Sequence, residues 1–410
     1  MPDPDSSPPL EAVKRRHDYP IGASPATASL RGMLAGKIEH DGPLRFPDFM
    51  AAALYEPELG YYARGTRQIG RGGDFFTSVS VGPLFGNLLA RRFLREWREL
   101  GSPGKWRIIE CGAHDGTLAA DVLGALQQLD APAFAALEYA ICEPLPRLQA
   151  AQRETLGKFG ATVVFADGPD PLAENPLPGV VFGNELLDAL PFHLVEWQSG
   201  GWRECCVGLD SNGDFIWQTD HTITDPLLLE ALAPLGGNFP EGYRTEVRTN
   251  FRPFLEPLVR CLSSGLLLWP DYGFARPEYY LPERHQGTLR TFSNHRAGED
   301  PLATPGEIDI TAHVDFTAAA ETALALGCHV RTFRNQGAWL TETGREWLLS
   351  LEGAPPSDLL RQFQTLTHPA HLGGSFHMIE LAWKNPAAPT LSETDSHRLA
   401  LCACPVPGGR

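Results

Sequence analysis

Short apolar runs alternate with longer amphipathic stretches over most of the chain. A short apolar run bounded by turn residues predicts a buried strand, and apolar positions three or four residues apart predict a helix with one buried face. Seven segments predict strands, namely 107–111, 138–143, 161–165, 180–183, 265–273, 328–333 and 375–383. Helices are predicted around and between them, over 83–100, 117–128, 145–156, 316–326 and 358–367. This alternation predicts an α/β, Rossmann-like fold with a seven-stranded, mostly parallel sheet and helices on both faces.

The segments outside this pattern divide the chain further. Residues 1–26 are rich in Pro and Ser and predict a disordered lead-in. Residues 27–104 are expected to form an N-terminal helical and lid region, and residues 105–195 and 258–383 the core around the sheet. Hairpin-like alternation predicts an inserted subdomain over residues 196–257. Residues 384–410 form a polar, Pro-rich tail.

Composition narrows the classes of function. The chain has 410 residues, 43% of them hydrophobic, which is enough for a sizeable core. Its net charge of −16 argues against nucleic acid as a partner, because phosphate backbones bind basic surfaces. The charge is compatible with a basic peptide partner, although a solvated acidic surface would explain it equally well. The oligomeric state is left open.

The eight cysteines and the N-terminus bear on metal binding and localisation. No pair of Cys-x-x-Cys elements exists, so we expect no metal site. The acidic N-terminus lacks a signal peptide, and no apolar run approaches the length of a membrane span. We therefore expect a cytoplasmic protein that has no membrane partner.

The first strand leads into a turn with the spacing of a ligand-binding loop. Gly112 and Gly116 bracket the turn, and a helix follows at once. Glycines let a ligand approach the backbone, and a helix N-terminus offers free N–H groups. An ordinary strand-to-helix connection is the alternative. His114 occupies the middle position, where a dinucleotide-binding turn normally keeps glycine.

Acidic residues follow the next two predicted strands. Glu143 is placed to accept hydrogen bonds from the two hydroxyls of a ribose, and Asp167 lies where an adenine would bind. Surface acids at strand ends are common and offer a simpler explanation. A nucleoside ligand fits both NAD and S-adenosylmethionine. The missing middle glycine favours S-adenosylmethionine, which has no pyrophosphate to accommodate, and the longer excursion between the last two strands favours a class I methyltransferase fold.

Asn184, Glu185 and Asp188 follow the fourth strand and should lie at the same edge of the sheet. Glu185 and Asp188 could instead cap the turn in which they lie. A segment rich in Gly, aromatic and hydroxyl residues, 55–78, is typical of a loop that covers a ligand.

Many of these motifs resemble the MidA-like family of S-adenosylmethionine-dependent methyltransferases, which includes the mitochondrial complex I assembly methyltransferase. The resemblance extends from about residue 34 to residue 383. The matching stretches, in chain order, are 57–62, 73–78, 85–86, 110–112, 116–118, 143–144, 183–191, 271–273, 288–289, 305–306 and 309–316, together with Gln152, His295 and Gln336.

The resemblance implies that S-adenosylmethionine is the cofactor and that the partner is a protein substrate presenting an arginine, by analogy with methylation of a complex I subunit. It implies a cofactor site made of Glu110, Gly112, Gly116, Glu143, Asp167, Asp74, Thr77 and Ser78, the last three belonging to a lid. Asn184, Glu185 and Asp188 would lie near the transferred methyl group. Glu185 and Asp188 would hold the guanidinium in a bidentate pair and remove a proton.

The chain departs from the family pattern at two places. Ala113 and His114 replace Pro and Gly in the turn, and Ser80 lies in the lid where the family has an acidic residue. These departures favour one alternative, a non-catalytic assembly factor that keeps the fold and binds a partner protein through the inserted subdomain and the loop rich in Gly and aromatic residues. A small-molecule methyltransferase also stays open, because the sequence does not show what enters the acidic site. A nicotinamide dehydrogenase is disfavoured by the absent glycine and by the resemblance.

Overall fold

The computed structural model describes residues 25–64, 77–293, 296–298, 300–351, 353, 356–385, 391–392, 396, 398–399 and 401. The predicted lead-in falls outside these residues except for its last two positions, which begin a helix. Most of the predicted tail also falls outside them. Among the described residues, no helix is both long and apolar enough to cross a lipid bilayer.

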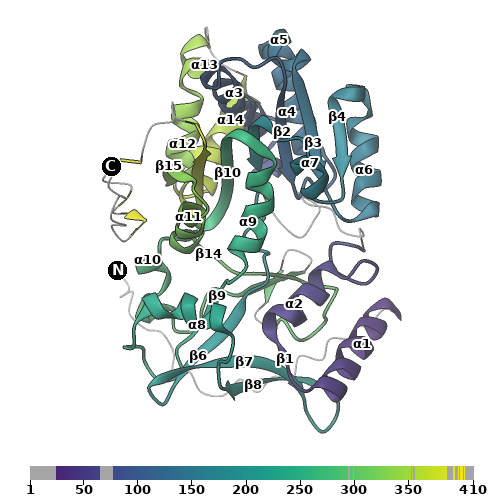
Figure 1. Ribbon diagram of the computed structural model, residues 1–410, viewed down its shortest axis with the longest axis vertical. Coiled ribbons are helices and arrows are strands. Elements are labelled where there is room, and N and C mark those ends of the chain that lie inside the picture. The colour runs from purple at the N-terminus through teal and green to yellow at the C-terminus, as the bar shows by residue number, and fades with distance from the viewer. Residues whose placement is uncertain are drawn as a thin grey trace, which may run out of the picture.

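A mixed sheet of eight strands forms the upper half of the molecule (Figure 1). Its strands are β2 (Trp106–Cys111), β3 (Leu137–Cys142), β4 (Val163–Ala166), β5 (Leu177–Phe182), β10 (Leu262–Phe274), β14 (Val314–Asp315), β15 (His329–Asn335) and β16 (Phe376–Trp383). Seven of them lie in the order β15-β16-β10-β5-β2-β3-β4, and β14 pairs with the end of β10. All neighbours are parallel except where β16 runs antiparallel between β10 and β15. The predicted α/β fold is confirmed; the eighth strand, which has only two residues, was not predicted because it is too short to show a pattern.

Successive side chains of a strand point to opposite faces of the sheet, so both faces of this sheet are apolar and helices cover both. Ile108 contributes to one core and Ile109 to the other. The first core also receives α3 (Leu84–Glu99), α4 (Thr117–Leu129), α6 (Pro146–Leu156), α12 (Gln336–Thr343) and α14 (Ser357–Thr367). The second receives α7 (Asp170–Ala173), α9 (Phe251–Arg260) and α11 (Phe316–Ala325). The sequence patterns predicted α3, α4, α6, α11 and α14 but not α9 or α12.

A second, antiparallel sheet lies below the main sheet in Figure 1. It consists of β1 (Leu44–Arg45), β6 (His193–Gln198), β7 (Gly201–Leu209), β8 (Phe215–His221) and β9 (Arg244–Val247). One face packs against α1 (Pro25–Asp41) and α2 (Phe46–Tyr55), and the other against α8 (Pro226–Leu232). We call this sheet and its three helices the second lobe. The boundary expected at residue 257 falls inside α9, whose apolar side chains join the core of the main sheet; the domain boundaries themselves stay a prediction.

The remaining elements are short. A three-stranded sheet contains β11 (Arg290–Ser293), β12 (Arg296–Gly298) and β13 (Asp309–Thr311). The short helices are α5 (Ala131–Ala135), α10 (Arg276–Tyr279), α13 (Arg345–Ser350) and α15 (Leu372–Ser375). The 3-10 turns are η1 (Val79–Val81), η2 (Gly157–Thr162), η3 (Ala233–Leu235) and η4 (Pro282–Arg284).

One buried arginine ties the second lobe to the main sheet. Arg248, which follows β9, donates hydrogen bonds to the backbone carbonyls of Leu190 at 3.2 Å and Asp188 at 2.6 Å, after β5. It also donates to the carbonyls of Ala312 at 2.8 Å and His313 at 2.7 Å, before β14. Since a guanidinium has five donors in a rigid plane, it fixes the relative positions of these two segments.

Candidate functional site

The turn after β2 has the backbone of a ligand-binding loop. Gly112 and Gly116 have φ angles of 69° and 83°, and Gly116 begins α4. Asp115 accepts a hydrogen bond from the N–H of Thr117 at 3.0 Å and so caps the first turn of the helix. A Cβ atom on Gly112 would lie 3.0 Å from the side chain of Leu186, so the close approach of these two segments favours glycine.

His114 takes the left-handed conformation that a glycine would adopt at this position, with φ of 47°. For an L residue this conformation costs about 1–2 kcal/mol. Its ring nitrogen Nδ1 lies 3.8 Å from Asp115 Oδ1, and its side chain is 32% exposed. The backbone path of the turn is therefore kept although glycine is absent.

Two glutamines of α6 connect the turn to the acids after β3 and β4. Gln152 donates to the carbonyl of His114 at 2.9 Å and to Glu143 Oε2 at 3.3 Å. Gln149 donates to the carbonyl of Glu143 and to Asp167 Oδ1, both at 2.7 Å. The structure thus brings the predicted turn, ribose ligand and adenine-side acid together. Neither glutamine was assigned a role from the sequence, although their spacing of three on one helix face could have suggested one.

Glu143 and Glu110 differ in their surroundings. Glu143 is 4% exposed, its carboxylate accepts a hydrogen bond from the N–H of Leu145 at 2.9 Å, and burial raises its pKa. Glu110 lies on β2 and accepts a hydrogen bond from the hydroxyl of Tyr139 at 2.5 Å; burial raises its pKa to about 8. Its contacts therefore lie inside the core on the α4 side of the sheet.

The turn after β5 is held by an acid from the neighbouring strand. Asp271 Oδ2 on β10 accepts the consecutive N–H groups of Leu186, Leu187 and Asp188 at 3.1, 2.8 and 3.2 Å. Asp271 is fully buried. Asp271, and not Glu185, therefore caps this turn. Asp271 falls in one of the stretches that resemble the family, but the sequence assigned it no role.

Glu185, Asp188 and Asp271 form what we call the carboxylate cluster. Burial first, and the charge of Asp188 second, raise the pKa of Glu185 to about 8. Burial also raises the pKa of Asp188, although the hydroxyl of Tyr272 donates to it. Burial, with the charges of Asp188 and Glu185, raises the pKa of Asp271. Three carboxyl groups crowded together in this way are stabilised by a cation.

Unpartnered atoms indicate what kind of cation would fit. Asn184 donates to Glu185 Oε1 at 3.0 Å, yet Asn184 Oδ1 and Asp188 Oδ1 are buried and have no hydrogen-bond partner in the described part of the structure. Buried acceptors without donors are rare in folded proteins. No group of three or more His, Cys, Asp or Glu among the described residues is arranged to hold a metal ion. A cation that carries several N–H donors would satisfy these atoms.

The described part of the predicted lid closes against the cluster. Ser78 is fully buried, its hydroxyl donates to Gln336 Oε1 at 3.1 Å, and its N–H donates to the carboxyl of Glu185. Thr77 and Ser80 pair through their hydroxyls at 3.0 Å, so Ser80 closes the turn in which the family has an acid. Asp74, the other predicted lid residue, lies outside the described residues.

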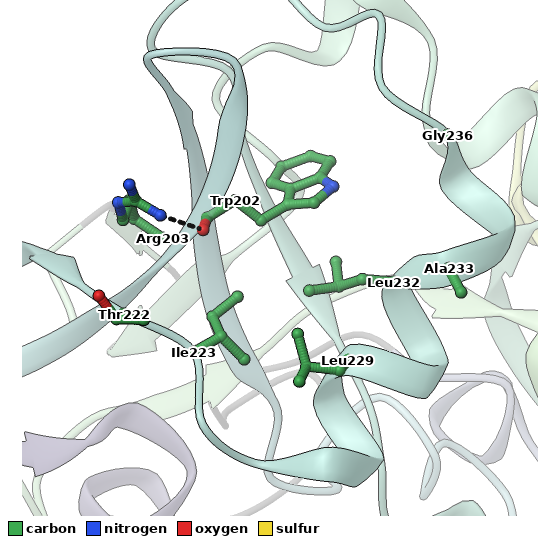
Figure 2. A pocket seen from close by; sticks show the side chains of 8 residues that line it. All are labelled: Trp202, Arg203, Thr222, Ile223, Leu229, Leu232, Ala233 and Gly236. Carbon is green, nitrogen blue, oxygen red and sulfur yellow. Dashed lines mark hydrogen bonds between the residues drawn. The ribbon is translucent and has the colours of Figure 1, made fainter.

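A separate cavity of about 400 Å³ lies in the second lobe, between β7 and α8 (Figure 2). Its lining is mainly apolar and contains none of the predicted site residues: Trp202, Arg203, Thr222, Ile223, Leu229, Leu232, Ala233 and Gly236. No carboxylate lines this cavity, so it lacks the acidic groups that are found at the edge of the main sheet.

Comparisons with known proteins identify the family. A family model of S-adenosyl-L-methionine-dependent methyltransferases matches residues 88–334. The chain is 28% identical over 407 residues to the protein arginine methyltransferase NDUFAF7 homolog, mitochondrial, of Drosophila melanogaster, covering 92% of this chain and 90% of the relative. It is 27% identical to the protein arginine methyltransferase NDUFAF7, mitochondrial, of Mus musculus, covering 91% of this chain and 89% of the relative. A crystal structure from Burkholderia thailandensis, bound to S-adenosylhomocysteine, shares 33% identity and a TM-score of 0.79, covering 89% of this chain and 95% of that one.

The residues present fit this cofactor. The turn at Gly112 lets a ligand approach the backbone, and a side chain at that position would crowd Leu186. Gln152 Oε1 is buried beside Glu143 and has no hydrogen-bond partner within the described structure. A bound ligand could donate a hydrogen bond to this atom. The fold, this site and the family match agree, and the chain belongs to the family of S-adenosylmethionine-dependent methyltransferases.

Proposed function

We propose that this methyltransferase, of class I by its fold, methylates an arginine side chain of a protein. The observation that carries the proposal is the carboxylate cluster together with the buried, unpartnered acceptors Asn184 Oδ1 and Asp188 Oδ1, which call for a cation with several N–H donors. A guanidinium is such a cation, and its planar fork matches a pair of carboxylates. The names of the Drosophila and mouse relatives, which describe protein arginine methyltransferases, support this substrate class.

The cofactor residues divide by position along the edge of the sheet. Gly112 and Gly116 would border the methionine part, Glu143 would accept the ribose hydroxyls, and Asp167 would lie toward the adenine. Thr77 and Ser78 would cover the cofactor from the lid. When bound, the cofactor supplies an electrophilic methyl group on a sulfonium.

The chain's own residues would orient the nucleophile and receive the proton. Glu185 and Asp188 hold the guanidinium so that one nitrogen faces the methyl group, and such alignment can contribute roughly 7–11 kcal/mol. A bound guanidinium lowers the pKa of Glu185 and favours its carboxylate. As the new N–C bond forms and the C–S bond breaks, the substrate nitrogen loses one proton, which Glu185 accepts.

Glu185→Gln tests the proposal, because it keeps the shape of the side chain and removes its basicity. We expect binding of S-adenosylhomocysteine, measured by calorimetry, to stay within about threefold, and methylation of arginine peptides, measured by mass spectrometry, to fall by roughly 100-fold or more. Glu174→Gln, at an exposed position, is the matched control. Undiminished turnover in Glu185→Gln, or methylation by the wild type of lysine or of a small molecule in place of arginine, would overturn the assignment.

A further inference from the structure

Two tyrosines from the N-terminal part of the chain stack beside the carboxylate cluster. Tyr55, the last residue of α2, and Tyr62 have ring centroids 5.5 Å apart and an interplanar angle of 22°. Both residues are half-buried. The sequence indicated that this aromatic segment would cover a ligand, and the proposed function gives these rings no role.

Hydrogen bonds fix the pair at the cluster. Tyr55 donates to the carbonyl of Ala189 at 2.8 Å, one residue after Asp188. Tyr62 donates to Asp309 Oδ1 at 3.0 Å, and Asp309 is buried on β13. Burial first, and then the charges of Asp309, Asp188 and Glu143, raise the pKa of Tyr55. The Tyr55 hydroxyl is therefore within electrostatic reach of both the carboxylate expected to bind ribose and the one expected to bind substrate.

This arrangement combines two features that recognise one kind of cation. Aromatic faces attract cations, and a planar guanidinium can also stack flat on a ring, which an ammonium cannot. The unpartnered acceptors Asn184 Oδ1 and Asp188 Oδ1 are buried in the turn just before Ala189, the residue to which Tyr55 donates. A planar cation with many N–H donors requires acceptors around its edge and can stack an aromatic ring on its flat face.

We propose that the Tyr55–Tyr62 pair is the specificity-determining wall of the substrate site and selects a guanidinium over an ammonium by stacking. The inference rests on the proposed function, since it concerns the substrate group of the same site. It assigns to the second lobe, through α2, the choice of substrate, while the main sheet holds the cofactor and the reacting groups.

Two probes of equal charge test the wall in the full-length protein. Each is an adenosine with a three-carbon linker on its 5′ carbon, ending in a guanidine in one probe and in a primary amine in the other. Calorimetry on the wild type should show the guanidine probe binding tighter on the order of 10-fold. Tyr55→Leu and Tyr62→Leu should each reduce this ratio several-fold. Tyr55→Phe keeps the ring and should keep most of the ratio, although it loses the hydrogen bond to Ala189.

The outcomes separate the wall from the proposed function. If the wild type binds S-adenosylhomocysteine but shows no preference for guanidine, the arginine assignment fails, and the wall with it. If the wild type prefers guanidine and Tyr55→Leu and Tyr62→Leu both keep the full ratio, only the wall fails. A merely structural role would weaken both probes and S-adenosylhomocysteine together and leave the ratio unchanged, which also overturns the inference.

Discussion

Asp271→Ala removes the acceptor that holds the turn carrying Glu185 and Asp188. Its Oδ2 atom accepts three consecutive backbone N–H groups, of residues 186–188, inside a fully buried environment. A buried donor left without a partner costs about 1–3 kcal/mol, so the three together amount to roughly 3–9 kcal/mol. Removing a third carboxyl from the cluster relieves like-charge repulsion and opposes this loss, which favours the lower end, about 3 kcal/mol.

The effect should be local and can be measured by hydrogen exchange with mass spectrometry. A loss of about 3 kcal/mol in local stability corresponds to exchange of the amides of residues 186–188 that is faster on the order of 100-fold. Asp271→Asn keeps one oxygen acceptor without the charge, and neutral hydrogen bonds are roughly half as strong, so we expect an increase on the order of 10-fold. Asp170→Ala, at a side chain that is 88% exposed, should leave these amides unchanged.

One result would refute this reasoning. If the amides of residues 186–188 exchange in Asp271→Ala within about twofold of the wild type, the three hydrogen bonds do not hold the turn. If they exchange faster while methyl transfer stays at the wild-type rate, the turn does not need to be held for catalysis.

Three further predictions concern other parts of the site. The raised pKa of Glu185, about 8 against an ordinary 4.5, means that between these pH values the folded protein retains a proton that the unfolded chain releases. The free energy of unfolding, measured by denaturant titration, should therefore fall as the pH rises through this window, and it should fall less in Glu185→Gln. If Glu185 titrated normally, both proteins would show the same pH dependence. His114→Gly should keep the affinity for S-adenosylhomocysteine within about threefold of the wild type. His114→Val places a β-branched residue at a positive φ and should lose stability and affinity. A tenfold gain in the affinity of the glycine variant would show instead that the imidazole obstructs the site. Gln152→Ala removes the hydrogen bonds to the turn and to Glu143 and should lower the affinity for S-adenosylhomocysteine, measured by calorimetry, roughly tenfold. Gln128→Ala, at an exposed position, is the control and should have no effect. Equal affinities in the two variants would contradict the role of Gln152.

The sequence by itself determined the elements of the main sheet and the turn that follows its first strand. Seven strands and most of the longer helices next to them could be predicted because burial imposes a period of two or 3.6 residues, which is a local property of the chain. Gly112 and Gly116 could be recognised for a similar reason, since positive φ angles restrict the residue type directly. The acids at the strand ends followed from the rule that parallel strands end at one edge.

The tertiary structure alone decided which of these residues act on one another. The antiparallel position of β16 between β10 and β15, and the pairing of the two-residue β14, depend on contacts that no periodicity encodes. The acceptor for the turn at residues 186–188 comes from a strand more than 80 residues away, and Tyr55 reaches Ala189 across 134 residues. Burial then raises the pKa of Glu185 far above that of an exposed glutamate, because the interior solvates a carboxylate poorly. Hydrogen-bond partners and desolvation are properties of the packed molecule, and they turn a set of acids in the sequence into a site that can hold a cation.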